Sequence, residues 1–221
     1  MTSVIDEGLP SLNATLSAHR AAMPAPLPGM RALRESMWER LDRSGIEAQS
    51  VQAGEQAPDF TLPDVNQQPV TLSDRLKDGP VVVVFYRGDW CPFCNFTLRA
   101  YQAILPQITQ LYHATLMAIS PQKPDYSLLT VQHKELTYPV LSDLGNVVAE
   151  RYRVVWTLPA VLRIDSEVPE HNGDNSYRLP MPGTFIIDQA GVVRLASVHA
   201  DWTKRTEPAE ILAVLRELQT S

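Results

Sequence analysis

The two cysteines of this 221-residue sequence, Cys91 and Cys94, are separated by only Pro92 and Phe93. Since the chain contains no other cysteine, any thiol–disulfide chemistry must run between these two. The pair follows the β-branched apolar run 81–86 and precedes a segment that is compatible with a helix. A thiolate is a nucleophile, and a second thiol two residues away can resolve the product of its attack. The spacing therefore predicts a redox-active dithiol.

Pro92 suits the first position of a helix, where the missing N–H is no loss and the fixed φ is already helical. Cys91 is then the N-cap and Cys94 lies in the first turn, so both sulfurs are expected beside unpaired N–H groups at the positive end of the helix dipole. Such surroundings can lower a thiol pKa from about 8.5 to roughly 3.5–7.5. We expect a thiolate at neutral pH and a disulfide that forms without a large backbone shift.

Two other interpretations of the cysteine pair are weaker. A closed zinc site needs four ligands, and the histidines show no paired metal spacing; they are His19, His113, His133, His171 and His199. Inert core cysteines are disfavoured because the lead-in 88–90, Gly-Asp-Trp, resembles a loop. We expect no metal and no cofactor.

The composition excludes several classes of protein. A hydrophobic content of 44% is enough for a core, while a net charge of −6 and the lack of a basic run argue against nucleic-acid binding. The apolar run 81–86 is far shorter than the roughly 20 residues that span a bilayer, and the N-terminus lacks the pattern of a secretory signal. We expect a cytoplasmic protein, where a cysteine pair is more often catalytic than structural.

We divide the chain into an N-terminal helical extension, residues 1–53, and a domain, residues 54–221. Apolar residues at helical spacing predict two helices in the extension, which the proline-rich segment 23–29 separates; the residues are Leu9, Leu12, Leu16, Met30, Leu33, Met37 and Leu41. We interpret them as a helical hairpin packed on the domain or on a partner subunit.

Strand and helix patterns alternate in the domain, which predicts an α/β fold with a mixed, mostly parallel sheet covered by helices. The expected elements are a hairpin over 60–72, strands at 81–86, 115–119 and 140–141, a helix over 92–111 kinked at Pro106, helices at 125–134 and 147–152, a hairpin over 185–198, and a helix over 207–218 capped by Thr206. Residues 156–179 interrupt this rhythm as a long loop, and long loops in compact domains are often functional.

Four segments of the chain resemble the AhpC/TSA peroxiredoxin-like family of the thioredoxin superfamily. They are 57–62 (APDFTL), 83–94 (VVFYRGDWCPFC), 138–143 (YPVLSD) and 182–188 (PGTFIID). The resemblance implies a thioredoxin fold, a mixed central sheet flanked by helices with the redox site at the start of the helix after the 81–86 strand. It also implies a thiol-dependent peroxidase that reduces hydrogen peroxide or alkyl hydroperoxides, is recycled by thioredoxin or a similar dithiol, and forms a homodimer.

The chain departs from the family at its site. When the family motif Pro-x-x-x-Thr/Ser-x-x-Cys is aligned without gaps, its peroxidatic cysteine falls on Cys94, its Thr/Ser on Cys91 and its Pro on Arg87. The activating arginine of the family precedes the strand that begins here at Thr184, and this chain has Pro182 at that place. The Pro-x-Thr-Phe pattern resembles the cis-proline of thioredoxin-type reductases, so we expect a cis bond at Pro182, close to the sulfurs.

Two orders of attack remain open at the dithiol. If Cys94 attacks and Cys91 resolves, the protein is a peroxidase; if Cys91 attacks first, it is a thioredoxin-like oxidoreductase of protein disulfides. Arg87 and Arg178 are the candidates for stabilising a thiolate and orienting a peroxide, since a fixed cation favours the charged sulfur; either could equally be an ordinary surface arginine. Trp90 is expected to be a packing lid that reports the redox state.

A third hypothesis is a redox sensor without enzymatic activity. In that case the disulfide would alter the 156–179 loop or the N-terminal helices and so change a contact with a partner. Asp89 has two interpretations as well, a proton carrier for the dithiol or a solvated loop acid.

Overall fold

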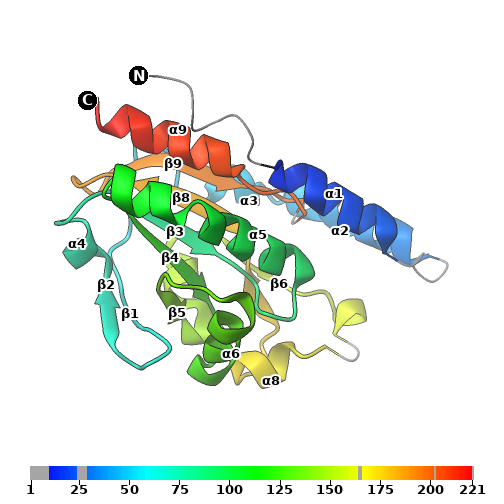
Figure 1. Ribbon diagram of the computed structural model, residues 1–221. Helices are drawn as coiled ribbons and strands as arrows, with labels where there is room; N and C mark the ends of the chain where they lie inside the picture. The colour runs from blue at the N-terminus through cyan, green and yellow to red at the C-terminus, as the bar shows by residue number, and fades with distance from the viewer. Residues whose placement is uncertain (1–9, 24–28, 164–165, 202, 221) are drawn as a thin grey trace.

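The computed structural model describes residues 10–23, 29–163, 166–201 and 203–220, and its centre is a five-stranded sheet of order β5-β4-β3-β8-β9 (Figure 1). The strands are β3 (Val81–Phe85), β4 (Thr115–Ser120), β5 (Val140–Ser142), β8 (Gly183–Ile187) and β9 (Val193–Val198). The β3–β4 and β4–β5 pairs are parallel, whereas β3–β8 and β8–β9 are antiparallel. The sheet is therefore mixed, as expected, but only half of its pairings are parallel.

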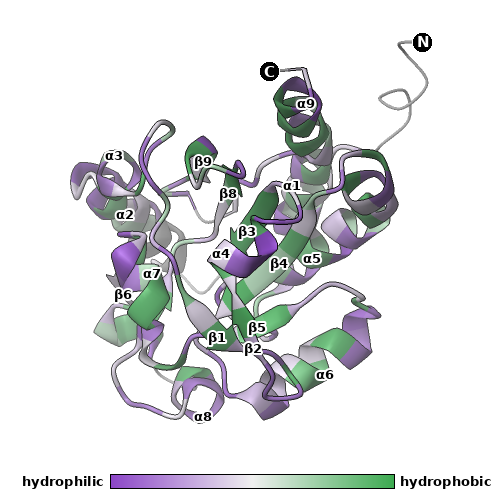
Figure 2. Cartoon of the chain, turned by 90° about the vertical axis from the view of Figure 1, so that its left-hand side faces the viewer, coloured by the Kyte–Doolittle hydropathy of each residue, from purple (hydrophilic) through white to green (hydrophobic). Residues whose placement is uncertain are grey.

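Strand β3 lies at the centre of the sheet because its valine run is apolar on both faces, which suits a strand that is buried on both sides. Since side chains alternate along a strand, Val81, Val83 and Phe85 contribute to one hydrophobic core, while Val82 and Val84 contribute to the other. Figure 2 shows the central strands as largely hydrophobic segments, with helices of mixed hydropathy around them. The molecule is thus three layers thick.

Helices cover both faces of the sheet. One core contains residues from α1 (Leu12–Ala22), α5 (Pro92–Ala103) and α9 (Pro208–Leu218), with α6 (Pro124–Lys134) packed at its edge. The other core contains residues from α2 (Met30–Arg43), α3 (Ile46–Gln49), α4 (Leu72–Arg75), α7 (Val147–Arg151) and α8 (Val168–Asn172). Both cysteines lie on the α5 side.

The remaining elements are short. An antiparallel hairpin joins β1 (Thr61–Pro63) to β2 (Pro69–Thr71), as the sequence predicted. The expected helix over 92–111 does break near Pro106: α5 ends at Ala103, and a π-helical turn, Gln107–Leu111, follows. A proline interrupts a helix because it has no N–H and its ring clashes with a preceding carbonyl.

The 156–179 segment is more ordered than the long loop we expected. It begins and ends on a two-stranded antiparallel ladder of β6 (Val155–Thr157) and β7 (Arg178–Pro180), and α8 lies between the two strands. Single turns of 3-10 helix occur at Ala160–Leu162 and, before α7, at Leu144–Asn146. The two ends of the segment therefore lie side by side, and the segment between them contains α8.

The expected cap of the C-terminal helix is also different. Thr206 was predicted as the N-cap of α9, but Pro208 occupies the first helical position and Glu207 is the N-cap. Proline favours that first position, so the helix starts one residue later than the threonine would require. The Glu207 carboxylate accepts hydrogen bonds from backbone N–H groups at the start of α1.

The two predicted helices of the extension are present as α1 and α2. Leu12 and Leu16 are buried in the core on the α5 side, while Met37 is buried in the core on the opposite side. The guanidinium of Arg20 lies 4.2 Å from the Trp38 ring centroid and joins the two helices. Leu9 and most of the 23–29 segment fall outside the described residues. Both helices share the hydrophobic cores of the rest of the chain, and the boundary at residue 53 stays a prediction.

Candidate active site

The dithiol lies where strand β3 meets helix α5. Cys91 is the N-cap of α5 with extended φ and ψ of −92° and 107°, and Pro92 occupies the first turn, as the sequence predicted. The backbone N–H of Cys94 donates a hydrogen bond of 3.3 Å to the Cys91 sulfur. One of the unpaired N–H groups at the helix start is thereby satisfied by a thiol sulfur.

Both cysteines are buried and reduced. Cys91 is 0% exposed and Cys94 is 1% exposed, so neither sulfur meets solvent in this state. Burial by itself raises a thiol pKa because a thiolate loses hydration. A reactive thiolate at this depth therefore needs nearby positive charge.

Two buried arginines supply that charge. Arg87, two residues after the end of β3, donates to the Cys91 sulfur at 3.0 Å, and its charge also acts on Cys94. Arg205, from the connection between β9 and α9, lies with its Nη2 3.6 Å from the Cys94 sulfur. Each arginine is only 7% exposed, so water screens these interactions little. Arg87 was a sequence candidate, whereas Arg205 was not.

The two sulfurs differ in their pKa. Burial opposes ionisation of Cys94, but the hydrogen bond from the Cys91 thiol and the positive charges of Arg205 and Arg87 lower the pKa of Cys94 well below its usual value. Burial and the hydrogen bond to Cys94 raise the pKa of Cys91 well above its usual value, despite Arg87. These shifts favour a thiolate on Cys94 over a thiolate on Cys91.

Trp90 packs beside the site, as the sequence led us to expect. The Arg87 guanidinium carbon lies 5.3 Å from the Trp90 ring centroid, and Trp90 is half-buried against both cores. The close approach of this indole requires a glycine two residues earlier. A Cβ at Gly88 would lie 2.4 Å from the Trp90 Nε1 atom, and the φ of Gly88 is +153°.

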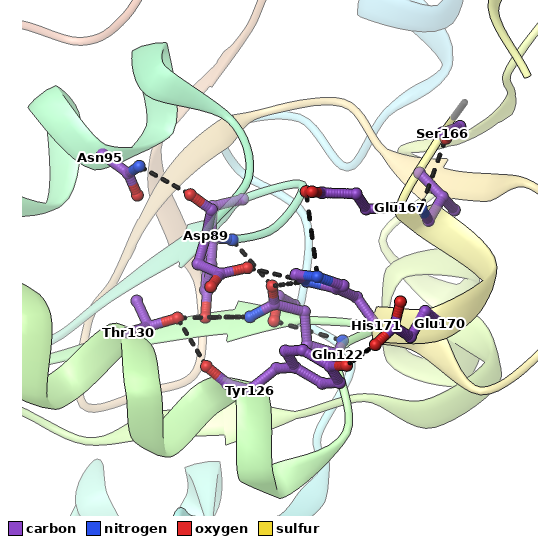
Figure 3. Close-up of polar contacts among 12 residues, drawn as sticks. Asp89, Asn95, Gln122, Tyr126, Thr130, Ser166, Glu167, Glu170 and His171 are labelled. Atoms are coloured by element: carbon purple, nitrogen blue, oxygen red, sulfur yellow. Dashed lines mark hydrogen bonds and ion pairs between the residues drawn. The ribbon is translucent and has the colours of Figure 1, made fainter. Parts of the chain in front are cut away.

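The loop before Cys91 is anchored by three side chains (Figure 3). The Asp89 carboxylate pairs with His171 Nδ1 at 2.8 Å, and the Asp89 N–H donates to Gln122 Oε1 at 2.7 Å. The Asn95 amide of α5 donates to the Asp89 carbonyl at 2.7 Å. His171 belongs to α8, so the 156–179 segment reaches the redox loop. Asp89 is thus a partnered residue and not a solvated loop acid.

The imidazole of His171 is itself held from several sides. The Tyr126 ring stacks on it with a centroid distance of 3.9 Å, and the Tyr126 hydroxyl donates to Glu170 at 2.6 Å. The carbonyl of His171 accepts the N–H of Lys123 at 2.8 Å. Helix α6 and its preceding residue therefore fix α8 in place beside the loop.

Two other sequence candidates differ from expectation. The described residues contain no cis peptide bond, so the expectation of a cis bond at Pro182 is wrong. Pro182 lies between β7 and β8, directly before the first residue of β8, where a trans proline fits. Arg178 pairs with Glu150. It lines a cavity of 610 Å³ beneath α2, and neither cysteine is among the residues that line this cavity. The arginines that contact the sulfurs are Arg87 and Arg205.

The described residues show no group of three or more His, Cys, Asp or Glu side chains that could hold a metal ion. The described helices also include none long and apolar enough to cross a membrane.

The fold and the buried dithiol define a redox protein of the thioredoxin superfamily, and comparison with known proteins gives its family. Residues 53–196 match the AhpC/TSA family. The chain is 30% identical to a chloroplastic peroxiredoxin Q of Suaeda salsa over 81% of its own length and 74% of the relative. It is 27% identical to a putative peroxiredoxin bcp of Coxiella burnetii over 76% of its length and 99% of the relative.

Solved structures agree with this match. The crystal structure of peroxidoxin BcpB from Mycobacterium tuberculosis superposes with a TM-score of 0.60 and 25% identity, covering 76% of this chain and 98% of that one. A peroxiredoxin-like protein from Aquifex aeolicus, 17% identical, shares the fold with a TM-score of 0.62 over 76% of this chain and 88% of its own. The chain belongs to the AhpC/TSA family. The two relatives named above are described as peroxiredoxins.

Proposed function

We propose that this protein is a thiol-dependent peroxidase in which Cys94 is the peroxidatic thiol and Cys91 resolves. The supporting observation is the buried Arg205 guanidinium, whose Nη2 lies 3.6 Å from the Cys94 sulfur. Although burial opposes ionisation, the hydrogen bond from Cys91 and the charges of Arg205 and Arg87 lower the pKa of Cys94. The family alignment of the peroxidatic position with Cys94 supports the same assignment.

The proposed reaction has three steps. The Cys94 thiolate attacks the terminal oxygen of a hydroperoxide, the O–O bond breaks, and the leaving alkoxide or hydroxide takes up a proton from water. The resulting sulfenic acid condenses with the Cys91 thiol, which releases water and forms the disulfide. An external dithiol then reduces that disulfide and is itself oxidised.

Arg205 and Arg87 have related roles in this scheme. Guanidiniums fixed near a developing negative charge stabilise it without reorganisation at the moment of reaction. We propose that Arg205 stabilises the attacking thiolate and that Arg87 holds the Cys91 sulfur towards it. Trp90 packs on Arg87 and limits the access of water to the pair.

The partners and the setting are proposals of the same kind. We propose a thioredoxin-like dithiol as the reductant and a homodimer as the assembly, both from the family resemblance. We propose a cytoplasmic setting, since a reduced compartment suits a catalytic cysteine pair. The relative from Suaeda salsa is described as chloroplastic, so the family occupies more than one compartment.

A second candidate is a thiol–disulfide oxidoreductase that acts on protein disulfides. It is favoured by the surroundings of Cys91, whose sulfur accepts hydrogen bonds from Arg87 and from the Cys94 N–H. Hydrogen bonds of this kind stabilise a thiolate on the first cysteine of such a motif.

Stopped-flow tryptophan fluorescence separates the two candidates. Reduced protein, Cys91→Ser and Cys94→Ser are mixed with hydrogen peroxide over a range of concentrations. For a peroxidase, a fast phase that is linear in peroxide persists in Cys91→Ser and disappears in Cys94→Ser. Peroxide consumption that survives in Cys94→Ser would exclude the assignment, and a mixed disulfide trapped on Cys91 in that variant would favour the oxidoreductase.

A further inference from the structure

Helix α1 is bonded directly to the segment that carries Arg205. The Asn13 side-chain amide donates to the Arg205 carbonyl at 2.7 Å, and the Arg205 N–H donates to the Asn13 Oδ1 at 3.0 Å. These two bonds link one side chain of α1 to both backbone groups of the residue whose guanidinium contacts Cys94. The backbone of Arg205 is therefore fixed by a residue 192 positions away in the sequence.

Glu207 also links the start of α1 to the segment that carries Arg205. Its carboxylate accepts hydrogen bonds from the backbone N–H groups of Leu12 and Asn13, at 2.8 and 2.9 Å, and from the Ser11 hydroxyl at 2.9 Å. A carboxylate at the first turn satisfies donors that a helix leaves unpaired and complements the positive end of its dipole. Glu207 is two residues after Arg205, so α1 is bonded both to Arg205 itself and to the chain directly after it.

The other end of α1 reaches the cysteine turn itself. The His19 ring lies edge-on to Phe93 with a centroid distance of 5.4 Å, and Phe93 is one of the two residues between the cysteines. Leu12 and Leu16 are buried in the core that also contains both cysteines. One helix thus contacts the thiol turn at its C-terminal end and the arginine segment at its N-terminal end (Figure 1).

We propose that α1 is a positioning element of the active site, in which Asn13 holds Arg205 against Cys94. The inference deepens the proposed function, on which it rests for the importance of Cys94. A separation of 3.6 Å between guanidinium and sulfur is near the limit for a hydrogen bond to sulfur, so a small displacement of the Arg205 backbone weakens the contact. Asn13 acts through Arg205 and does not touch the sulfur.

A cavity borders the junction. It has a volume of 350 Å³ and is lined by residues of α1, among them Asn13 and Arg20, and by residues that follow β9, among them Lys204 and Arg205. If α1 moves away, water enters next to the guanidinium and screens its charge from the thiolate. The docking of α1 thus fixes the distance and limits the screening as well.

The test compares Asn13→Ala with Thr15→Ala on the same helix. Thr15 is exposed, and its hydroxyl donates to the carbonyl of Ser11, the N-cap of α1. Alanine has a higher helix propensity than either residue, so both changes favour α1 as a helix. The readout is the ultraviolet absorbance of the thiolate as a function of pH, which requires no peroxide and stays informative if peroxide is not the substrate.

We expect the thiolate titration of Asn13→Ala to move up by about one pH unit, in the range for weakened contact with a nearby cation, and that of Thr15→Ala to stay in place. The pH–rate profile with hydrogen peroxide should shift equally, with about tenfold slower reaction on its acid limb. In an Arg205→Gln background, Asn13→Ala should cause no further shift, because the two changes act through one contact.

Three results would overturn the inference. They are an unshifted titration in Asn13→Ala, an equal shift in Thr15→Ala, and a full additional shift in the Arg205→Gln background. If Asn13→Ala does not fold, Glu207→Gln provides the second variant, since it keeps an acceptor oxygen and removes the charge that docks α1. A rise in its titration is expected, and no change in a folded Glu207→Gln protein would count against the inference.

Discussion

Replacing Arg205 by glutamine removes a cation whose Nη2 lies 3.6 Å from the Cys94 sulfur and keeps a polar side chain. At an effective dielectric constant of about 20, two unit charges separated by the observed 3.6 Å attract by about 4–5 kcal/mol. Since one pH unit corresponds to about 1.36 kcal/mol, the upper limit for the rise in the pKa of Cys94 is about three units. Water that enters the variant will offset part of this, so we predict a rise of about one to three units.

The assay is the pH dependence of thiolate absorbance in the reduced protein, with Arg87→Gln as the matched control. Arg87 hydrogen-bonds Cys91 at 3.0 Å, and its charge lowers the pKa of Cys94 less than the charge of Arg205 does. A Cys94 thiolate should therefore respond more to the loss of Arg205 than to the loss of Arg87. A larger rise in Arg87→Gln, with little change in Arg205→Gln, would refute the reasoning. It would place the negative charge on Cys91, as in the oxidoreductase alternative.

Three further predictions concern the surroundings of the dithiol. Gly88→Ala should lower the free energy of unfolding by about 1–3 kcal/mol, measured with urea, because of its positive φ and the contact of the new Cβ with Trp90; an unchanged midpoint would contradict this. His171→Ala should lower the free energy of unfolding by about 1–3 kcal/mol, because it leaves the Asp89 carboxylate without its partner. A double-mutant cycle with Asp89→Asn should show a coupling energy between the two sites. Additive effects would show that the pair contributes nothing to stability. Burial opposes ionisation of Glu207, but hydrogen bonds from α1 lower its pKa below 4.5. The stability that this docking contributes should therefore be complete above pH 4.5 and be lost as the pH falls through the lowered pKa of the folded state, which limited proteolysis of α1 can show. The Glu207→Gln protein should lack this pH dependence. An identical pH profile in that variant would argue against the role of Glu207.

Much of the fold follows from local sequence patterns. The valine run of β3, the proline directly after Cys91, and the leucine spacing of α1 each favour one local structure that long-range packing does not overturn. The failures arose where a neighbouring residue changed the outcome. Because Pro208 occupies the first helical position, the N-cap of α9 is Glu207 and not Thr206. The segment that we expected to be a long loop has its two ends joined by the ladder between β6 and β7.

The site was only partly predictable for a related reason. Cys91, Cys94 and Arg87 are close in sequence, so spacing alone brings them together. Arg205 contacts a sulfur across 111 residues, and its segment carries no pattern that links it to a cysteine. His171 lies in a stretch that reads as a loop, so the sequence offered no reason to place it beside Asp89. Long-range contacts made by single charged side chains require the tertiary structure.

The identity of the oxidised cysteine tests the central claim most directly. Reduced Cys91→Ser and Cys94→Ser proteins are treated with stoichiometric hydrogen peroxide in the presence of dimedone, which traps sulfenic acids, and the modified peptide is identified by mass spectrometry. We predict rapid labelling of Cys94 in Cys91→Ser and little labelling of Cys91 in Cys94→Ser. Rapid labelling of Cys91 in Cys94→Ser, with Cys94 unmodified in the other variant, would contradict the assignment of Cys94 as the peroxidatic thiol.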